Sequence, residues 1–386
     1  MDTPSPLIYL DNAATTFPKH PGVLQEMVDH YGRLGVSPGR GSYDLATQCA
    51  HFVEDVRRQI CSFFGSDDSH RVVFSNNSTD ALNTIIMGLV EPGCHIVSSR
   101  LEHNSVLRPL HHLRDRGLIE FDLVSFDGQG FIDPYDVATA ITPRTRFVIL
   151  NHVSNVLGTI QPVAEVGRIC TELEVPLILD VSQGAGIVPI DMRAMNVQAV
   201  AFTGHKSLLG PTGIGGLVLR DGLDVRATRF GGTGYESWSP VHPEEYPYRL
   251  EAGTPNVMGV MGLAAGLRYI AQRGLANIFS HEMALAATLR DALSSIEGVR
   301  LYCADDLKQH VAVLTCNVRD MDSEDVAAIL DGDFNIATRS GLHCAPLVHE
   351  DIGTSPGGGV RFSFGPLNSS EDVSAAVSAV RAIATG

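Results

Sequence analysis

Short apolar runs alternate with stretches of helical periodicity from about residue 70 onwards. The runs are rich in β-branched residues and are expected to form strands. The predicted strands are RVVFS, HIVSS, FDLVSF, RFVILNHV, VPLILDVS, AVAFTG and GGLVLR. Between them, segments such as STDALNTIIMGLV and PVAEVGRICTEL have the apolar spacing of helices. This alternation predicts an α/β fold with a mostly parallel sheet that is covered by helices on both faces.

The last third of the chain follows a different pattern. Two consecutive helices are predicted from NVMGVMGLAAGLRYIAQRG and HEMALAATLRDALSSI. The segments HVAVLTCNV, SEDVAAIL, GGVRFSFG and SSEDVSAAVSAVRAIA then predict a small α+β domain. Its last helix is expected to begin with a capping box formed by Ser369 and Asp372. We therefore expect a large domain over residues 16–273 and a small domain made of residues 1–15 and 274–386.

Residues 229–249 (RFGGTGYESWSPVHPEEYPYR) lie between these patterns and have no clear periodicity. The segment is rich in glycine, proline and aromatic residues. Long loops of this kind are often functional, so we expect a lid over a site or a contact between subunits.

Composition excludes several classes of partner. The 386 residues are 44% hydrophobic and 19% charged, as in a globular protein with a substantial interior. A net charge of -16 argues against nucleic acid and acidic membranes as partners. No apolar run approaches the roughly 18 residues of a membrane span, and the first residues lack the features of a secretory signal. The seven cysteines are scattered without a CxxC pair, so we expect no metal site and a cytoplasmic location.

Lys206 and Asp180 are the first candidates for chemistry. Lys206 stands between an apolar strand and a glycine-rich turn in AFTGHKSLLGPTGIGG, and is either a surface lysine or a Schiff-base lysine. Asp180 ends the strand in LILDVSQGAG, where it could cap the next segment or bind a ligand. Pyridoxal phosphate (PLP) needs such a carboxylate to keep its ring nitrogen protonated. Gln183 could then donate to the phenolic oxygen of the cofactor, and the pair of Lys206 and Asp180 favours this interpretation.

The segment FSNNSTDALNTI offers a place for a phosphate group. A strand is expected to end at Ser75 and a helix to begin near Ser78. The free N–H groups at such a helix start suit a phosphate. Alternatively, Ser78 or Thr79 is an ordinary N-cap, and the two functions are compatible.

Three further polar residues are expected close to strand ends. His103 could stack on a pyridine ring and handle protons on a substrate thiol, or be structural. Asn155 could bind substrate or only form a turn. Arg361 could hold an α-carboxylate with its planar guanidinium, or form a surface salt bridge.

Cys344 follows His343 in TRSGLHCAPLVHE, close in sequence to Arg339 and Gly341. A thiol on a segment flanked by glycine is either a nucleophile or a small buried apolar residue. The surrounding candidates favour the nucleophile.

Taken together, these segments resemble the class V aminotransferase family, and within it the cysteine desulfurases and selenocysteine lyases. The resemblance begins at YLDNAATT, continues through LEHNSV, DVSQGAG, FTGHKSLLGPTGIGG and EAGTPN, and ends with RSGLHCAPL and VRFSFGPLN. It implies a PLP-dependent transferase of fold type I, with a large domain built on a seven-stranded sheet. It also implies a homodimer with two sites at the subunit interface.

The resemblance carries roles to individual residues. It implies contacts to PLP from Lys206, Asp180, Gln183, His103, Thr79, Thr203 and His205, and the helix start adds Ser78 as a further candidate. It implies that Thr254 in EAGTPN contacts the phosphate bound by the partner subunit, and that Asn155 and Arg361 bind the substrate carboxylate. Arg339 is a further candidate for binding the substrate. Lys206, His103 and Cys344 would be the catalytic residues, with Cys344 accepting the sulfur as a persulfide.

The expected reaction converts L-cysteine to L-alanine, and the acceptor protein that receives the sulfur next is left open. Leu342 stands where many type II desulfurases have a histidine, and APLVHEDIGTSPGGG is not the most familiar sequence after the cysteine. The alternatives are a selenocysteine lyase, another PLP-dependent β-lyase or aminotransferase, and an inactive scaffold protein in sulfur trafficking.

Overall fold

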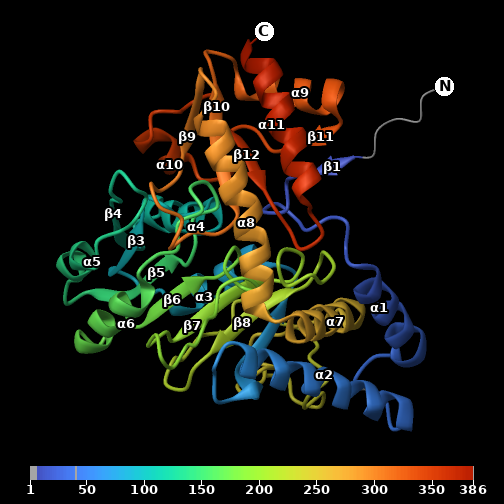
Figure 1. Cartoon of the computed structure of the whole chain (residues 1–386). Helices are drawn as coiled ribbons and strands as arrows, with labels where there is room; N and C mark the ends of the chain where they lie inside the picture. Colours follow the sequence, from blue (N-terminus) through green and yellow to red (C-terminus); the bar gives the residue numbers. More distant parts are fainter. Residues whose placement is uncertain (1–6, 40, 386) are drawn as a thin grey trace.

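The central sheet has seven strands. They are β2 (Val72–Ser75), β3 (Cys94–Ser99), β4 (Ile119–Val124), β5 (Thr145–Asn151), β6 (Leu177–Asp180), β7 (Ala199–Thr203) and β8 (Gly215–Leu219). In this computed structural model, which describes residues 7–39 and 41–385, their order is β2-β8-β7-β6-β5-β3-β4. Only β8 among them runs antiparallel to its neighbours, β2 and β7. The predicted mostly parallel, seven-stranded sheet is confirmed (Figure 1).

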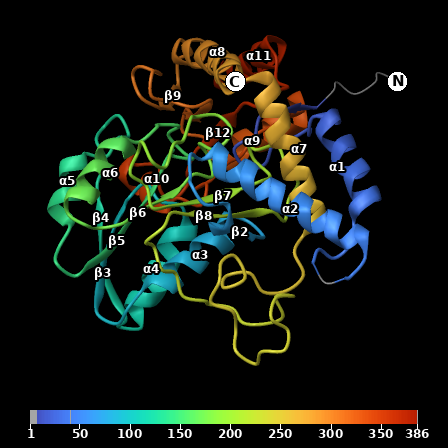
Figure 2. The same cartoon turned by 90° about the horizontal axis from the view of Figure 1, so that it is seen from below.

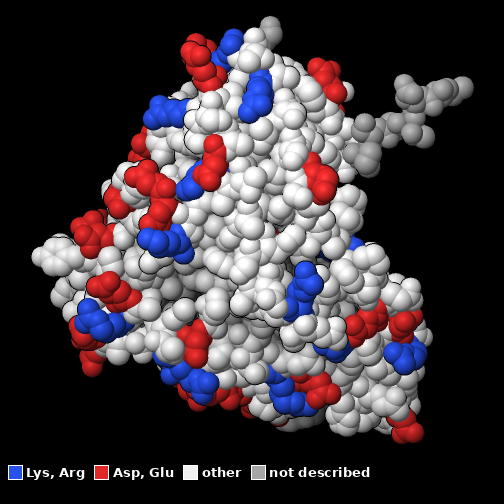
Figure 3. Space-filling model, viewed as in Figure 1, with Lys and Arg blue, Asp and Glu red and all other residues white. Residues whose placement is uncertain are grey.

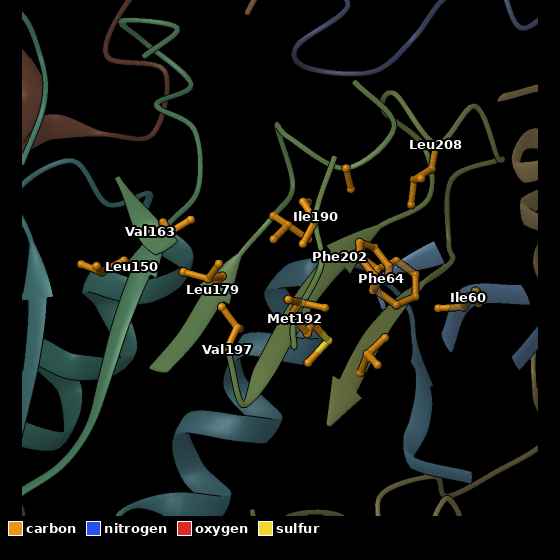
Figure 4. Packing of buried hydrophobic residues seen from close by; sticks show 14 of the residues in the cluster. Ile60, Phe64, Leu150, Val163, Leu179, Ile190, Met192, Val197, Phe202 and Leu208 are labelled. Atoms are coloured by element: carbon orange, nitrogen blue, oxygen red, sulfur yellow. The ribbon is translucent and has the colours of Figure 1, made fainter. Parts of the chain in front are cut away.

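Helices cover both faces of this sheet, as the apolar runs predict. They are α2 (Asp44–Phe63), α3 (Ser78–Leu89), α4 (Asn104–Asp115), α5 (Pro134–Ala140), α6 (Val163–Glu172) and α7 (Val257–Arg273), with α1 (Pro21–Leu34) packed on α7. On one face, Leu179 and Phe202 pack in a cluster with Ile60 of α2 and Val163 of α6 (Figure 4). Successive strand residues point to opposite faces. The alternate residues of the strands therefore form a second cluster with the apolar sides of α3 and α4.

A smaller unit with its own core stands over the sheet (Figure 1). Its elements are α8 (Leu275–Ser294), β9 (Val299–Tyr302), β10 (Val313–Val318), α9 (Ser323–Phe334), β11 (Ile336–Ala337), α10 (Pro346–Asp351), β12 (Val360–Ser363) and α11 (Ser370–Thr385). The strands β12, β10 and β9 form an antiparallel sheet in that order. The predicted α+β character of this part is confirmed, while the domain boundaries stay a prediction.

The first strand of the chain belongs to this smaller unit. Strand β1 (Ile8–Tyr9) pairs in parallel with β11, so that Ile8 lies opposite Ile336. At the start of α11, the backbone N–H of Ser369 donates to Asp372 Oδ2 at 3.0 Å, and Asp372 N–H donates to Ser369 Oγ at 3.4 Å. The predicted capping box is therefore present.

The segment between β8 and α7 contains no helix or strand in the structure. Figure 2 shows that it projects from the body of the molecule. Phe230, Trp238 and Val241 are 73%, 83% and 72% exposed along this segment. Exposed apolar side chains gathered on one loop indicate a surface suited to a contact with another chain.

Figure 3 shows lysine and arginine mixed with aspartate and glutamate on the side of the molecule in view. Within residues 7–39 and 41–385, no helix is long and apolar enough to cross a lipid bilayer.

Candidate active site

A cavity of about 250 Å³ lies at the carboxyl ends of the central strands. Strands β5 and β6 end at Asn151 and Asp180, and both side chains line it. Open α/β sheets commonly bind ligands at this edge. The predicted site residues that line the cavity are Ser78, Thr79, His103, Asn155, Asp180, Gln183, His205, Lys206, Arg339 and Arg361. Thr203, Thr254 and Cys344 lie outside its lining.

Lys206 enters the cavity from the turn that follows β7. Burial disfavours the charged amine and lowers the pKa of Lys206 to about 8, although Asp180 opposes this change. A lysine near this pKa is partly neutral at physiological pH, and a neutral amine can attack a carbonyl carbon. The local chemistry therefore fits a Schiff-base lysine better than a surface lysine.

Asp180 and Gln183 are both fixed by hydrogen bonds at the end of β6. Asp180 Oδ1 accepts from the backbone N–H of Ser182 at 2.9 Å and also from the Ser182 hydroxyl. Gln183 Nε2 donates to the carbonyl of Ala13 at 3.0 Å. Both side chains are buried, so their orientation is set before any ligand enters.

His103 has a structural role at the start of α4 and also lines the cavity. It is the N-cap of α4, and its Nδ1 accepts from the backbone N–H of Ser105 at 3.0 Å. Burial, followed by the charge of Lys206, lowers the pKa of His103 to about 4. The ring is therefore neutral, with its proton on Nε2, and it also lines the cavity.

The start of α3 has the features of an anion site. Asn77 is its N-cap and accepts from Asp80 N–H at 2.9 Å, so the interpretation of Ser78 or Thr79 as N-cap is wrong. This leaves Ser78 and Thr79 in the first turn, where backbone N–H groups point outward. Thr203 and His205 shortly precede Lys206 in the sequence. Thr203 Oγ1 and His205 Nδ1 are buried and have no hydrogen-bond partner among the described residues. These unsatisfied groups fit a phosphate ligand.

Arg361 lies in β12 and is 1% exposed. Its Nη2 donates to Asp11 Oδ1 at 2.8 Å, and its Nη1 donates to the carbonyl of Asn155 at 3.0 Å. Its Nε is buried without a partner among residues 7–39 and 41–385. The interpretation of Arg361 as a surface salt bridge is therefore wrong, and a buried guanidinium with a free donor suits a carboxylate.

Cys344 borders a second hollow of about 520 Å³ that shares Thr79, His103 and Ser105 with the first cavity. Its thiol is half-buried, and Arg339 Nη2 lies 3.4 Å from Sγ. The guanidinium therefore donates to the sulfur and places a positive charge beside it. A hydrogen bond ties the backbone at Cys344 to the start of α4: Asn104 N–H donates to the Cys344 carbonyl at 2.7 Å. The mobility expected of this segment stays a prediction.

Thr254 lies on the other side of the start of α3, where it borders a small hollow with Asp80 and Arg229. It is exposed, while Glu251 in the same EAGTPN segment is anchored by two 2.8 Å hydrogen bonds from the buried Arg57. A firmly held segment with an exposed threonine is suited to contact another subunit. The predicted role of Thr254 toward a partner subunit stays a prediction.

Several residues that shape the site were missed from the sequence. They are Asp11, Asn77, Asn151, Ser105 and Ser182. Asp11 lies within the segment YLDNAATT, so the resemblance contained a signal for it. Ser105 and Ser182 each follow a predicted site residue by two positions. At this spacing the side chain of the first residue can accept from the backbone N–H of the second.

Known proteins resemble this chain over nearly its whole length. The family model for class-V aminotransferases matches residues 8–376. A probable cysteine desulfurase from Methanothermobacter thermautotrophicus is 34% identical, with 95% of this chain and 92% of the relative covered. A cysteine desulfurase from Haloferax volcanii is 31% identical, with 99% and 90% covered.

Solved structures agree with this result. The apo structure of a cysteine desulfurase from Thermococcus onnurineus has a TM-score of 0.92 and 34% identity, and covers 98% of this chain and 95% of its own. A cysteine desulfurase from Escherichia coli has a TM-score of 0.85 and 28% identity, with 97% and 94% covered. The chain therefore belongs to the class-V aminotransferase family.

Proposed function

We propose that this chain is a PLP-dependent cysteine desulfurase that converts L-cysteine to L-alanine and transfers the sulfur to Cys344. The observation that carries the proposal is the convergence of Lys206, Asp180 and Arg361 on one cavity, with Cys344 beside it. Relatives named as cysteine desulfurases, similar over nearly the full length, support the same activity.

The cavity fits PLP in chemistry as well as in position. Lys206 would bind the aldehyde carbon, Asp180 the ring nitrogen, and Gln183 the phenolic oxygen. The hydroxyls of Ser78, Thr79 and Thr203 and the ring of His205 would hold the phosphate, and this would satisfy the unpartnered Thr203 Oγ1 and His205 Nδ1. When bound, PLP supplies an electron sink for the bonds at the substrate α-carbon.

The remaining residues bind and orient the substrate. The guanidinium of Arg361 would hold the α-carboxylate together with Asn155, and Arg339 would add positive charge at the same end of the cavity. Lys206, with a pKa lowered to about 8, can take and return the proton on the α-carbon. His103 has its proton on Nε2 and lines the cavity, so it can donate a hydrogen bond to the sulfur of the substrate.

The sulfur transfer balances as a reaction between two thiols. The bond from the substrate β-carbon to sulfur breaks, and a bond forms between that sulfur and Cys344 Sγ. Cys344 changes from a thiol to a persulfide, and the carbon product gains a proton and leaves as L-alanine. No further oxidant or reductant is required, since the sulfur atom moves from carbon to sulfur. The contact with Arg339 would keep a positive charge beside the attacking sulfur.

We further propose a homodimer in which Thr254 of each subunit contacts the phosphate in the other. The exposed position of Thr254 and the apolar side chains of the projecting loop support this arrangement. The large domain would comprise residues 16–273, and residues 1–15 and 274–386 the small one. The enzyme would act in the cytoplasm and pass its sulfur to an acceptor protein.

The test is incubation of the PLP-loaded enzyme with L-cysteine and a thiol reductant. Alanine and sulfide are measured for the wild type, Cys344→Ala and Cys303→Ala, because Cys303 is half-buried and lies outside the site. The wild type and Cys303→Ala should release both products in equal amounts, and Cys344→Ala neither. Turnover by Cys344→Ala, or turnover of L-selenocysteine alone, would favour the selenocysteine lyase instead.

A further inference from the structure

The histidine before Cys344 belongs to a buried chain of hydrogen bonds that the sulfur transfer does not use. His343 Nδ1 lies 3.1 Å from His349 Nε2, and His349 Nδ1 lies 2.7 Å from Thr354 Oγ1. The exposed fractions of these three residues are 2%, 0% and 8%. At its other end, His343 Nε2 lies 3.2 Å from the backbone carbonyl of Arg339.

The carbonyl at one end fixes the direction of every hydrogen bond in the chain. A carbonyl can only accept, so His343 carries its proton on Nε2 and its Nδ1 is an acceptor. His349 Nε2 must then donate to His343, which leaves His349 Nδ1 as an acceptor for the Thr354 hydroxyl. Burial lowers the pKa of His343 to about 2 and that of His349 to about 4, so both rings stay neutral at working pH.

The chain ends at an unusual stretch of backbone. His343 and Cys344 have φ values of 51° and 59°, and both therefore adopt the left-handed conformation that side chains other than glycine rarely take. Two successive residues in this conformation persist only where the surroundings hold them. The His343 carbonyl accepts from Asn155 Nδ2 at 2.7 Å, and the His343 ring is held by His349.

The same chain also connects the thiol to the substrate-binding strand. The Arg339 carbonyl that accepts from His343 also accepts from the backbone N–H of Arg361 at 2.7 Å. The side chain of Arg339 lies 3.4 Å from Cys344 Sγ. A displacement of His343 would therefore change the position of the thiol relative to Arg361, where the substrate carboxylate would bind.

We propose that His349 and Thr354 are positioning residues that hold His343 and Cys344 in their left-handed backbone and thereby aim the Cys344 thiol at the substrate. The proposal rests on the proposed function for the role of the thiol. Neither residue lines the cavity, so both act through His343. Attack by a positioned thiolate depends strongly on geometry, and loss of the chain should slow sulfur transfer more than substrate binding.

The test uses the hydroxyl of Thr354, because Thr354→Val removes it at nearly constant shape and Thr354→Ser keeps it. In the PLP-loaded enzyme, Thr354→Val should lower kcat for L-cysteine by about tenfold or more and leave KM within about twofold. Thr354→Ser should restore kcat to within about threefold of the wild type. Thr171→Val, which removes a hydroxyl from the exposed side of α6, should change neither constant.

Two further measurements do not depend on turnover. Alkylation of Cys344 by iodoacetamide should become at least about threefold faster in Thr354→Val and in His349→Phe, because the segment is released. Nitrogen-15 shifts of the histidine rings should show His343 and His349 both protonated on Nε2, with the His349 Nδ1 signal moved in Thr354→Val.

The outcomes separate the two proposals. If the wild type makes no alanine from L-cysteine, the proposed function fails, and the alkylation rates and ring shifts still decide whether the chain positions Cys344. Equal kcat and alkylation rates in Thr354→Val and the wild type would overturn the positioning role. So would a loss of kcat that Thr354→Ser does not restore, or a parallel rise of KM, because either indicates only a structural contribution.

Discussion

The buried Arg361 and the half-buried Asp11 form an ion pair, with 2.8 Å between Oδ1 and Nη2, across 350 positions of the sequence. The pair holds the guanidinium in place at the edge of the cavity. Removing Asp11 leaves the buried guanidinium of Arg361 without a compensating charge, and an uncompensated buried charge is costly.

Asp11→Ala should therefore raise KM for L-cysteine by about tenfold and lower the free energy of unfolding by about 2–3 kcal/mol. Asp11→Asn keeps an acceptor for Arg361 and should have a smaller effect on both quantities. Steady-state kinetics and denaturant unfolding measure these changes. Equal KM values for Asp11→Ala and the wild type would show that Asp11 does not orient the substrate-binding group.

Lys206→Ala should abolish the visible absorption of the PLP-loaded protein near roughly 420 nm, because no amine remains to bind the aldehyde carbon. Activity should fall by about 10⁴-fold or more, since the same amine moves the proton on the α-carbon. Absorption spectra and alanine release measure the two effects. Lys308→Ala is the control, because Lys308 is an exposed lysine paired with Asp306. A Lys206→Ala protein that keeps the band would exclude the Schiff base.

Thr203→Val should not lower the stability of the apo protein, but it should weaken the binding of PLP. The Thr203 hydroxyl is buried without a partner, and such a group costs about 1–3 kcal/mol. Its removal should leave the apo protein equally or more stable, and should weaken PLP binding by about tenfold. Thermal unfolding of the apo protein and PLP titration measure the two effects. Unchanged PLP affinity would remove Thr203 from the phosphate site.

Glu282 in α8 should make stability decrease at high pH. Burial raises its pKa from an ordinary 4.5 to about 8, and its Oε2 has no partner among the described residues. Between these values the folded protein binds the proton more tightly than the unfolded chain, so stability falls as pH rises from 4.5 through 8.

Glu282→Gln should remove this loss. Its free energy of unfolding should equal that of the wild type at pH 4.5. At pH 9 it should be higher than that of the wild type, by at most about 5 kcal/mol. Unfolding curves at the two pH values test this, with the exposed Glu297→Gln as control. A difference that does not depend on pH would show that the carboxyl group is not the cause.

If Thr254 acts across the dimer, mixing the inactive variants Lys206→Ala and Thr254→Asp should restore part of the activity. Lys206→Ala destroys the site of its own subunit, and Thr254→Asp should repel the phosphate bound by its partner. A mixed dimer then contains one site with both changes and one with neither. Equal amounts of the two, unfolded and refolded together, should recover about one quarter of the wild-type activity. No recovery would place Thr254 in its own subunit's site, and activity of Thr254→Asp alone would place it outside both.

The strands and the principal site residues could be predicted because their signals are local. A buried parallel strand is a continuous apolar run, and Asp180 follows such a run directly. The motif around Lys206 is equally local. The position of β8 between β2 and β7, and its antiparallel direction, depend on how distant strands pair and have no local signal.

The parts of the site that were missed depend on contacts over long distances or on a choice between neighbours. Asp11 gains its role from Arg361, far away in the chain. Asn77, Ser78 and Thr79 are all possible N-caps by residue type, and only the backbone shows that Asn77 is the cap. The buried chain through His349 and Thr354 requires the fold of α10 and the turn that follows it.

The pairing of β1 with β11 has a consequence for how the chain is made. The strand that completes this pair is synthesised more than three hundred residues after the first. Contacts of such sequence separation form late and slow the search for the native state. A chain still growing on the ribosome can fold much of the central sheet, yet it cannot form the ion pair of Asp11 and Arg361 until β12 has been made. Chains that stop before β11 lack both Arg361 and Cys344, so they would lack the proposed carboxylate site and the proposed sulfur acceptor.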